Sequence, residues 1–276
     1  MANQQKPSGI AWCDKTYNPV RGCRKLSAGC AHCYAAAMAP RNPAVLGTWG
    51  PDGERVFSAP GWEARFDAWE KKAAKAGKPM RIFVNSMWDP GEGPDRDGKE
   101  GRDGPRLEYL PVLAALVNIA RRCPSLRLQM LTKRPWNLVA WWEDSDLGEW
   151  PANLWIGAST ENQEEADERI PWLMQLPAAV RFLSVEPMLG PVDLAGWAID
   201  AEGSYPLDRL AWVVAGAESG PKARPMDLAW VRALRDQCAA AAVPFFFKQA
   251  MVAGKLVSLP ELDGKVWDEF PAEAAP

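Results

Sequence analysis

The chain has 276 residues, of which 47% are hydrophobic and 24% are charged, and its net charge is −3. This composition supplies enough apolar residues for a sizeable core, which excludes an intrinsically disordered protein. The nearly neutral charge argues against a protein that coats nucleic acid through phosphate contacts. With a single histidine, His32, a metal site built from several histidines is also excluded.

No apolar run approaches the roughly 18 residues of a membrane-spanning helix. The N-terminal residues show no apolar stretch behind basic residues, so we expect no secretory signal. We therefore expect a cytoplasmic protein without a membrane partner, in a compartment where cysteines stay reduced.

Short, continuously apolar runs recur along the chain, as is typical of strands buried on both faces. They cover residues 81–86, 126–132, 154–159, 181–186, 210–218 and 245–249, with 16–20 as a possible further strand. Helices are predicted between these runs, because apolar residues recur three and four positions apart after Pro60, at 107–120 and at 229–242. Thr160 followed by Gln163 is expected to cap one more helix.

Alternation of strands and helices predicts an α/β fold with a parallel sheet. We expect one domain over residues 1–276, a partial or closed (β/α) barrel of about six parallel strands. An open, doubly wound sheet fits almost as well. Residues 89–105, rich in glycine, proline and charge, are expected to form an inserted surface loop. Residues 255–270, around Asp263-Gly264, are expected to form a C-terminal hairpin.

Polar side chains follow each predicted strand. They include Asn85, Ser86, Lys133, Arg134, Ser159, Glu161, Glu186, Glu218, Lys248 and Gln249. The carboxyl ends of parallel strands meet on one face of a barrel or sheet, where ligands bind. Glu186 and Glu218 stand out because a carboxylate beside a buried strand is costly unless it is paired. A ligand-binding face is favoured, although each residue alone is compatible with a helix cap or a solvated charge.

Three of the six cysteines fall within eleven residues. They are Cys23, Cys30 and Cys33, in a cysteine loop over residues 22–34. Such a cluster is more typical of a metal or iron–sulfur site than of packing, which is the role we expect for Cys123 and Cys238. Three thiolates would leave one iron of a [4Fe–4S] cluster open for a ligand. A structural zinc ion would need a fourth ligand, either Cys13 or His32.

The run Cys30-Ala31-His32-Cys33-Tyr34 is similar to the second half of the signature of radical S-adenosylmethionine (SAM) enzymes, although six residues separate Cys23 from Cys30 where that signature most often has three. Segments along nearly the whole chain also resemble a bacteriophage-associated three-cysteine family of uncharacterised proteins. They are residues 12–34, 83–89, 131–135, 182–191, 216–226 and 245–249. That family is considered a distant relative of radical SAM enzymes, with spore photoproduct lyase among its suspected kin. Threonine is expected there in place of Cys13, which implies that Cys13 is not an obligatory ligand.

The resemblance implies that Cys23, Cys30 and Cys33 hold a [4Fe–4S] cluster whose open iron binds S-adenosylmethionine. One electron, from a donor such as flavodoxin or ferredoxin, would then release methionine and a 5′-deoxyadenosyl radical, which abstracts hydrogen from a substrate. Kinship with a DNA-repair lyase implies a nucleobase substrate, in DNA or as a nucleotide, extruded into the barrel mouth. The fifteen tryptophans would serve either base stacking or the core.

By the same resemblance, cofactor-binding roles fall to Tyr34 near the adenine, to Asn85 and Ser86 near the methionine end, and to Ser159, Glu161 and Glu186 near the ribose or amino group. Candidate catalytic residues are Lys133, Arg134, Glu218 and Lys248. The three cations among them suit an anionic substrate. Two non-enzymatic alternatives stay open: a zinc-stabilised module that binds nucleic acid or protein, and a barrel that has lost its chemistry and serves as a scaffold.

Overall fold

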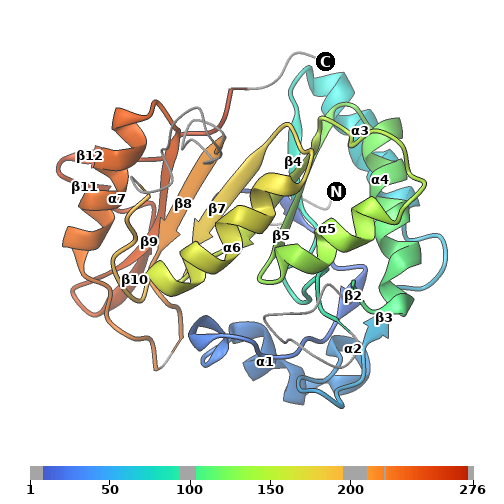
Figure 1. Ribbon diagram of the computed structural model, residues 1–276, viewed down its shortest axis with the longest axis horizontal. Helices are drawn as coiled ribbons and strands as arrows, with labels where there is room; N and C mark the ends of the chain where they lie inside the picture. Colours follow the sequence, from blue (N-terminus) through green and yellow to red (C-terminus); the bar gives the residue numbers. More distant parts are fainter. Residues whose placement is uncertain (1–8, 94–103, 195–209, 221, 273–276) are drawn as a thin grey trace, which may run out of the picture.

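The computed structural model describes residues 9–93, 104–194, 210–220 and 222–272. Its centre is an eight-stranded sheet in the order β1-β4-β5-β6-β7-β8-β9-β10. The strands are β1 (Lys15–Thr16), β4 (Met80–Phe83), β5 (Leu126–Thr132), β6 (Leu154–Ser159), β7 (Arg181–Val185), β8 (Trp212–Gly216), β9 (Phe245–Val252) and β10 (Lys255–Ser258). Neighbouring strands from β1 to β9 run parallel, and β10 returns antiparallel to β9 at the edge. The sheet curls into an open half-barrel (Figure 1).

The predicted strands agree with the observed ones most closely where the apolar run is longest. The boundaries of β5 and β6 are those expected, and β4, β7, β8 and β9 lie within a few residues of the expected ranges. The first predicted strand, residues 16–20, is instead divided into β1 and β2 (Val20–Arg21). Pro19 lies between them and has no N–H group to donate to a strand ladder, which explains the interruption.

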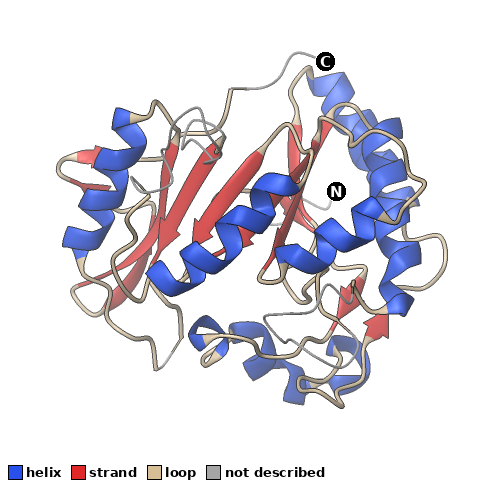
Figure 2. Ribbon diagram, in the orientation of Figure 1, coloured by secondary structure: helices blue, strands red, loops and turns tan. Residues whose placement is uncertain are grey.

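Helices connect the parallel strands and cover the outer face of the sheet (Figure 2). They are α3 (Ala64–Ala76), α4 (Leu110–Arg122), α5 (Pro135–Glu143), α6 (Gln163–Gln175) and α7 (Leu228–Ala240). The expected cap of α6 at Thr160 is wrong, because the side chain of Asn162 accepts the hydrogen bond from Glu165 N at 3.1 Å. None of the helices in the described ranges is long and apolar enough to cross a membrane.

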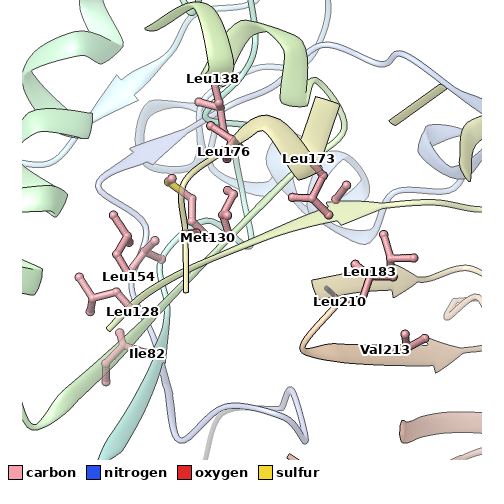
Figure 3. Close-up of a cluster of buried hydrophobic side chains, with 14 of the residues drawn as sticks. Ile82, Leu128, Met130, Leu138, Leu154, Leu173, Leu176, Leu183, Leu210 and Val213 are labelled. Atoms are coloured by element: carbon pink, nitrogen blue, oxygen red, sulfur yellow. The ribbon is translucent and has the colours of Figure 1, made fainter. Parts of the chain in front are cut away.

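The two faces of the sheet are filled differently. On the helix-covered face, aliphatic side chains of the strands and helices form one cluster, of which Figure 3 shows Leu128, Met130 and Leu173 among others. The inner face is aromatic, and its centre is Trp12, which is 1% exposed and lies 4.6 Å from Phe83 between ring centroids. Trp12 thereby forms the floor of the half-barrel.

The expected C-terminal hairpin is present but shorter. Strands β11 (Glu261–Leu262) and β12 (Lys265–Val266) pair antiparallel, and Asp263 and Gly264 between them both have positive φ, as a type I′ turn requires. The β10 strand, which the prediction included in this hairpin, pairs with β9 instead.

The expected inserted loop at 89–105 is described only at its two ends, since residues 94–103 lie outside the described ranges. Its first residues are not at the surface as predicted, because Asp89 is 6% exposed and Glu92 is fully buried. The Glu92 carboxylate pairs with Arg55 and accepts a hydrogen bond from the Tyr109 hydroxyl at 3.2 Å. Charge pairing therefore allows this polar segment to be buried.

The cysteine loop follows β2 and leads into the short helices α1 (Tyr34–Met38) and α2 (Pro43–Leu46). In Figure 1 this segment, drawn in blue, lies beyond the lower ends of the sheet strands. A two-stranded pair of β2 with β3 (Val56–Phe57) closes the segment back on itself. The fold thus brings the cysteines to the carboxyl ends of the strands.

Candidate functional site

A cavity of about 750 Å³ lies between the cysteine loop and the carboxyl ends of the strands. This volume suits a ligand of metabolite or nucleotide size. Residues singled out in the sequence that line it are Cys23, Cys30, Cys33, Tyr34, Asn85, Ser86, Lys133, Arg134, Ser159, Glu186, Glu218, Lys248 and Gln249. Glu161 is fully buried and is not among the lining residues. The cavity brings together residues more than 200 positions apart, while the molecule that they bind stays a prediction.

The cysteine loop begins with a close approach of backbone segments. Gly22 has a φ of +108°, and a Cβ there would stand 2.9 Å from the carbonyl oxygen of Glu54. The next residue, Cys23, accepts a hydrogen bond from Gly50 N on its carbonyl oxygen at 3.1 Å. Burial and the neighbouring carboxylate of Asp89 raise the pKa of the Cys23 thiol well above its usual value. The first thiol is therefore held at a fixed, enclosed position.

The segment that supports Cys23 is itself held by Arg55. The guanidinium group donates to the carbonyl oxygens of Thr48 at 3.2 Å and Gly50 at 3.1 Å, and its charge is balanced by buried Glu92. Gly50 in turn donates to Cys23. The buried Arg55–Glu92 ion pair thus fixes, through Gly50, the backbone of Cys23, which is a candidate metal ligand.

All six cysteines are free. Cys123 and Cys238 are buried in the core on the helix-covered face, as expected for packing residues. Burial raises the pKa of the Cys123 thiol to about 11 and that of Cys238 to about 12. These two cysteines lie in the core, away from the cavity that Cys23, Cys30 and Cys33 line.

Within the described ranges, no group of three or more histidine, cysteine, aspartate or glutamate side chains is arranged to hold a metal ion. A tetrahedral zinc ion with Zn–S bonds of about 2.3 Å needs sulfur atoms about 3.8 Å apart. The possible fourth ligands for zinc have other contacts: Cys13 donates to Ile10 O at 3.6 Å, and His32 contacts Glu218. Three free thiols line one cavity, and thiolates are the donors that iron–sulfur clusters use.

Glu161 ties the cysteine loop to the end of β6. Its carboxylate accepts from the Ser27 hydroxyl at 2.9 Å and pairs with Lys133 at 2.6 Å and Arg169 at 3.2 Å. Burial alone would raise the pKa of Glu161, but the two cations outweigh burial and lower it. Gly29 packs directly on this carboxylate, since an added Cβ would stand 2.6 Å from Cδ of Glu161.

Glu218 ties the same loop to the end of β8. His32 Nδ1 lies 3.0 Å from Oε2 of Glu218, and Arg224 donates to both carboxylate oxygens. The hydrogen bonds from Arg224 are the main reason that the pKa of Glu218 falls to about 2. Arg224 also donates from Nη2 to the carbonyl oxygen of Ala28 at 3.0 Å.

Asp89 and Arg134 form a third connection. The Asp89 carboxylate accepts from Thr132 Oγ1 at 2.6 Å and from Arg134 Nη1 at 2.7 Å. Arg134 Nη2 donates to the carbonyl oxygen of Arg24, at 3.1 Å, within the loop. The Arg134 side chain is 1% exposed, so its contacts within the cavity wall favour a structural role over ligand binding.

Glu186 and Lys248 pair at 3.0 Å on the floor side of the cavity. Glu186 also accepts from Ser184 Oγ at 3.1 Å and from the indole N–H of Trp12 at 3.4 Å. In the parts of the chain that the structure describes, this pair makes no hydrogen bond to the cysteine loop. Gly216 allows the Glu186 carboxylate to lie close to the end of β8, because a Cβ added at this position would stand 2.7 Å from Oε1 of Glu186.

The end of β4 carries the remaining predicted contacts. Asn85 is 5% exposed and holds β4 to β5, since its Oδ1 accepts from Leu131 N at 2.9 Å and its amide donates to Leu131 O. The Tyr34 hydroxyl donates to the carbonyl oxygen of Ser86 at 2.9 Å, which links α1 to the same strand end. Of these three, Tyr34 is the most open, with 46% of its surface exposed.

Sequence reasoning missed the partners that hold the loop: Ser27, Arg169 and Arg224. The requirement that Glu186 and Glu218 be paired was the one available signal, and each does have a cation beside it. Arg224 lies in an irregular segment between Gly220 and Asp227, where no periodicity indicates a position. Arg169 lies on the buried side of α6. From the sequence alone, a charged residue in a helix is expected at the surface.

The chain matches the model of one protein family over residues 7–97 and 105–271. The family is described as "Protein of unknown function (DUF5131)". No curated protein and no solved structure matches the chain. Since the match covers most of the sequence, the chain belongs to the DUF5131 family.

Proposed function

We propose that this DUF5131 protein is a radical SAM enzyme whose half-barrel corresponds to the partial barrel of that class. Cys23, Cys30 and Cys33 would hold a [4Fe–4S] cluster. The observation that carries the proposal is the gathering of three free cysteines from one loop around a cavity at the carboxyl ends of parallel strands. When bound, the reduced cluster would supply the electron that cleaves S-adenosylmethionine to methionine and a 5′-deoxyadenosyl radical.

The chain's own residues would position the reactants and exclude water. Ion-paired Glu161, Glu218 and Arg134 hold the loop over the cavity, and Trp12 closes the opposite side. Preorganised groups of this kind keep a reactive site in one geometry and protect it from solvent. Tyr34, which follows Cys33 in the sequence, and Ser86, whose carbonyl oxygen accepts from the Tyr34 hydroxyl, line the cavity and would contact the cofactor.

Two of the residues predicted to bind cofactor have contacts that suggest a supporting role instead. Glu161 is buried behind the wall and would orient the loop, and Asn85 would hold the end of β4. Ser159 and Glu186 line the cavity and remain available to a ribose or amino group.

The substrate would contact the floor side, where Lys248 offers an ammonium group beside the carboxylate of Glu186. Lys133 faces the same cavity from the end of β5 and suits an anionic group. These groups support as the substrate a nucleobase, in DNA or as a nucleotide, that enters through the open side of the half-barrel. The electron would come from a flavodoxin or ferredoxin. We also propose that the protein is related to the bacteriophage-associated three-cysteine proteins.

Anaerobic reconstitution with iron and sulfide tests the proposal. The wild-type protein is expected to turn brown and bind about four irons per chain, and to form 5′-deoxyadenosine from S-adenosylmethionine under a strong reductant. Cys23→Ala, Cys30→Ala and Cys33→Ala should each lose both properties. Cys123→Ala and Cys238→Ala are matched controls from the core and should keep them.

Three results would overturn the proposal. The first is a colourless wild-type protein with one zinc ion per chain that unfolds on chelation, which indicates the zinc-stabilised binding module. The second is full iron content and 5′-deoxyadenosine formation in Cys23→Ala. An iron–sulfur protein that never cleaves S-adenosylmethionine would instead indicate a scaffold.

A further inference from the structure

The middle of the cysteine loop is held from two sides. On one side Ser27 donates to Glu161, which follows β6, and on the other His32 contacts Glu218, which follows β8. Strand β7 lies between these two strands in the sheet. The turn that carries Cys30, residues Ala28–Cys30, therefore lies between two carboxylates that come from either side of one strand.

The two attachments differ in how much of the fold depends on them. Glu161 and Arg169 are both 0% exposed, so a change at either removes one partner of a buried charge. The Arg224 side chain is 30% exposed and that of Glu218 is 5% exposed, at the rim of the cavity. The Glu218 side is thus the attachment that can be altered with the fold retained.

Arg224 connects three parts of the chain at once. Its backbone N–H donates to Glu218 Oε2 at 2.9 Å, and its Nε donates to the same oxygen at 2.9 Å. Its Nη2 reaches the loop through the carbonyl oxygen of Ala28, at 3.0 Å. Because one planar guanidinium group makes the side-chain contacts with Glu218 and Ala28 in fixed directions, lysine cannot reproduce them all.

We infer that Arg224 and Glu218 are positioning residues for the cysteine loop, which hold residues 28–32 and thereby set where Cys30 and Cys33 stand relative to Cys23. Cys23 is held independently, by Gly50 and the Arg55–Glu92 pair. The inference rests on the proposed function only for what the cysteines bind. The position of the loop is a property of the protein itself.

Thiol labelling of the metal-free protein tests this directly. Wild type, Arg224→Ala and Glu218→Gln are treated with iodoacetamide under reducing, native conditions, and each cysteine is followed by peptide mass spectrometry. Loss of charge-assisted hydrogen bonds should raise the labelling rates of Cys30 and Cys33 about tenfold, because the loop opens more often. The rates of Cys23, Cys123 and Cys238 should stay unchanged.

Two further variants make the result specific. Arg224→Lys should restore part of the protection, since it keeps a charge beside Glu218 and loses the full fork of contacts. Arg232→Ala removes an arginine that pairs with Asp263 on the surface of α7, and its labelling pattern should match wild type. Equal labelling of Arg224→Ala and wild type overturns the inference. Faster labelling of Cys23, Cys123 and Cys238 as well overturns it too, because that indicates general loosening.

Reconstitution separates this inference from the proposed function. If the cysteines hold a cluster, Arg224→Ala should retain less iron, or give an altered electron paramagnetic resonance signal after reduction, with a melting temperature close to that of wild type. If wild type itself binds no iron, the proposed function fails, while the labelling result still decides whether Arg224 positions the loop.

Discussion

The ion pairs around the cavity and those on the outer surface of the helices use the same residue types in opposite surroundings. Glu161 and Arg169 pair with both side chains fully buried, whereas Asp263 and Arg232 pair with more than 40% of each side chain exposed. Exposed pairs are screened by water and salt and contribute little to stability. Buried pairs repay their desolvation only when the geometry is well satisfied, so they are sensitive to any change. In this protein the sensitive pairs hold a loop that has little regular secondary structure.

Replacing Glu161 by glutamine should produce the largest effect. It leaves fully buried Arg169 and partly buried Lys133 beside a neutral group, and removing one partner of a buried ion pair typically costs about 3–5 kcal/mol. Urea denaturation of the metal-free protein measures the loss. Asp263→Asn is the matched control and should unfold at nearly the wild-type midpoint. Similar midpoints for the two variants would show that burial does not distinguish the two groups of pairs.

The helix-covered half of the fold could be predicted because its signals are local. Strands β5 and β6 have the predicted boundaries, since continuous apolar runs are enough to specify strands buried on both faces. Helix α5 was missed because every residue from Pro135 to Trp141 is buried. A helix that is apolar all round shows no 3.6-residue period.

For the cavity, the sequence indicated which residues lie at the strand ends, but it did not indicate which of them pair with one another. The residues at the strand ends could be named because parallel topology brings them together wherever the loops run. Which carboxylate would meet which cation depends on irregular segments, such as the one that carries Arg224 to Ala28 over 196 positions. Such pairings are set by tertiary packing, which leaves no pattern in the sequence.

Replacing Gly29 by alanine should give an intermediate effect. The new Cβ would stand 2.6 Å from Cδ of buried Glu161, so the loop or the carboxylate must move, and overpacking of this kind costs about 1–3 kcal/mol. Gly190→Ala is a fitting control, because its Cβ would meet Asn162 at an ordinary 3.5 Å. Urea midpoints and Cys30 labelling together measure the change. A stable Gly29→Ala protein with wild-type labelling would mean that the contact with Glu161 does not fix the turn.

The smallest effect is expected at Asp263, where pH gives a test with a definite sign. Hydrogen bonds from Arg235 and then Arg232 lower the pKa of this carboxyl below its usual 3.8. A lowered pKa in the folded state means that the stabilisation is fully present above about pH 3.8 and is lost as the pH falls through the folded value. Urea midpoints of wild type and Asp263→Asn should therefore differ slightly at pH 7 and converge toward pH 3. They should also converge at neutral pH in 1 M salt, because the charges are exposed. A difference that grows in acid, or that salt leaves unchanged, would place Asp263 with the cavity pairs and remove the contrast between the two groups.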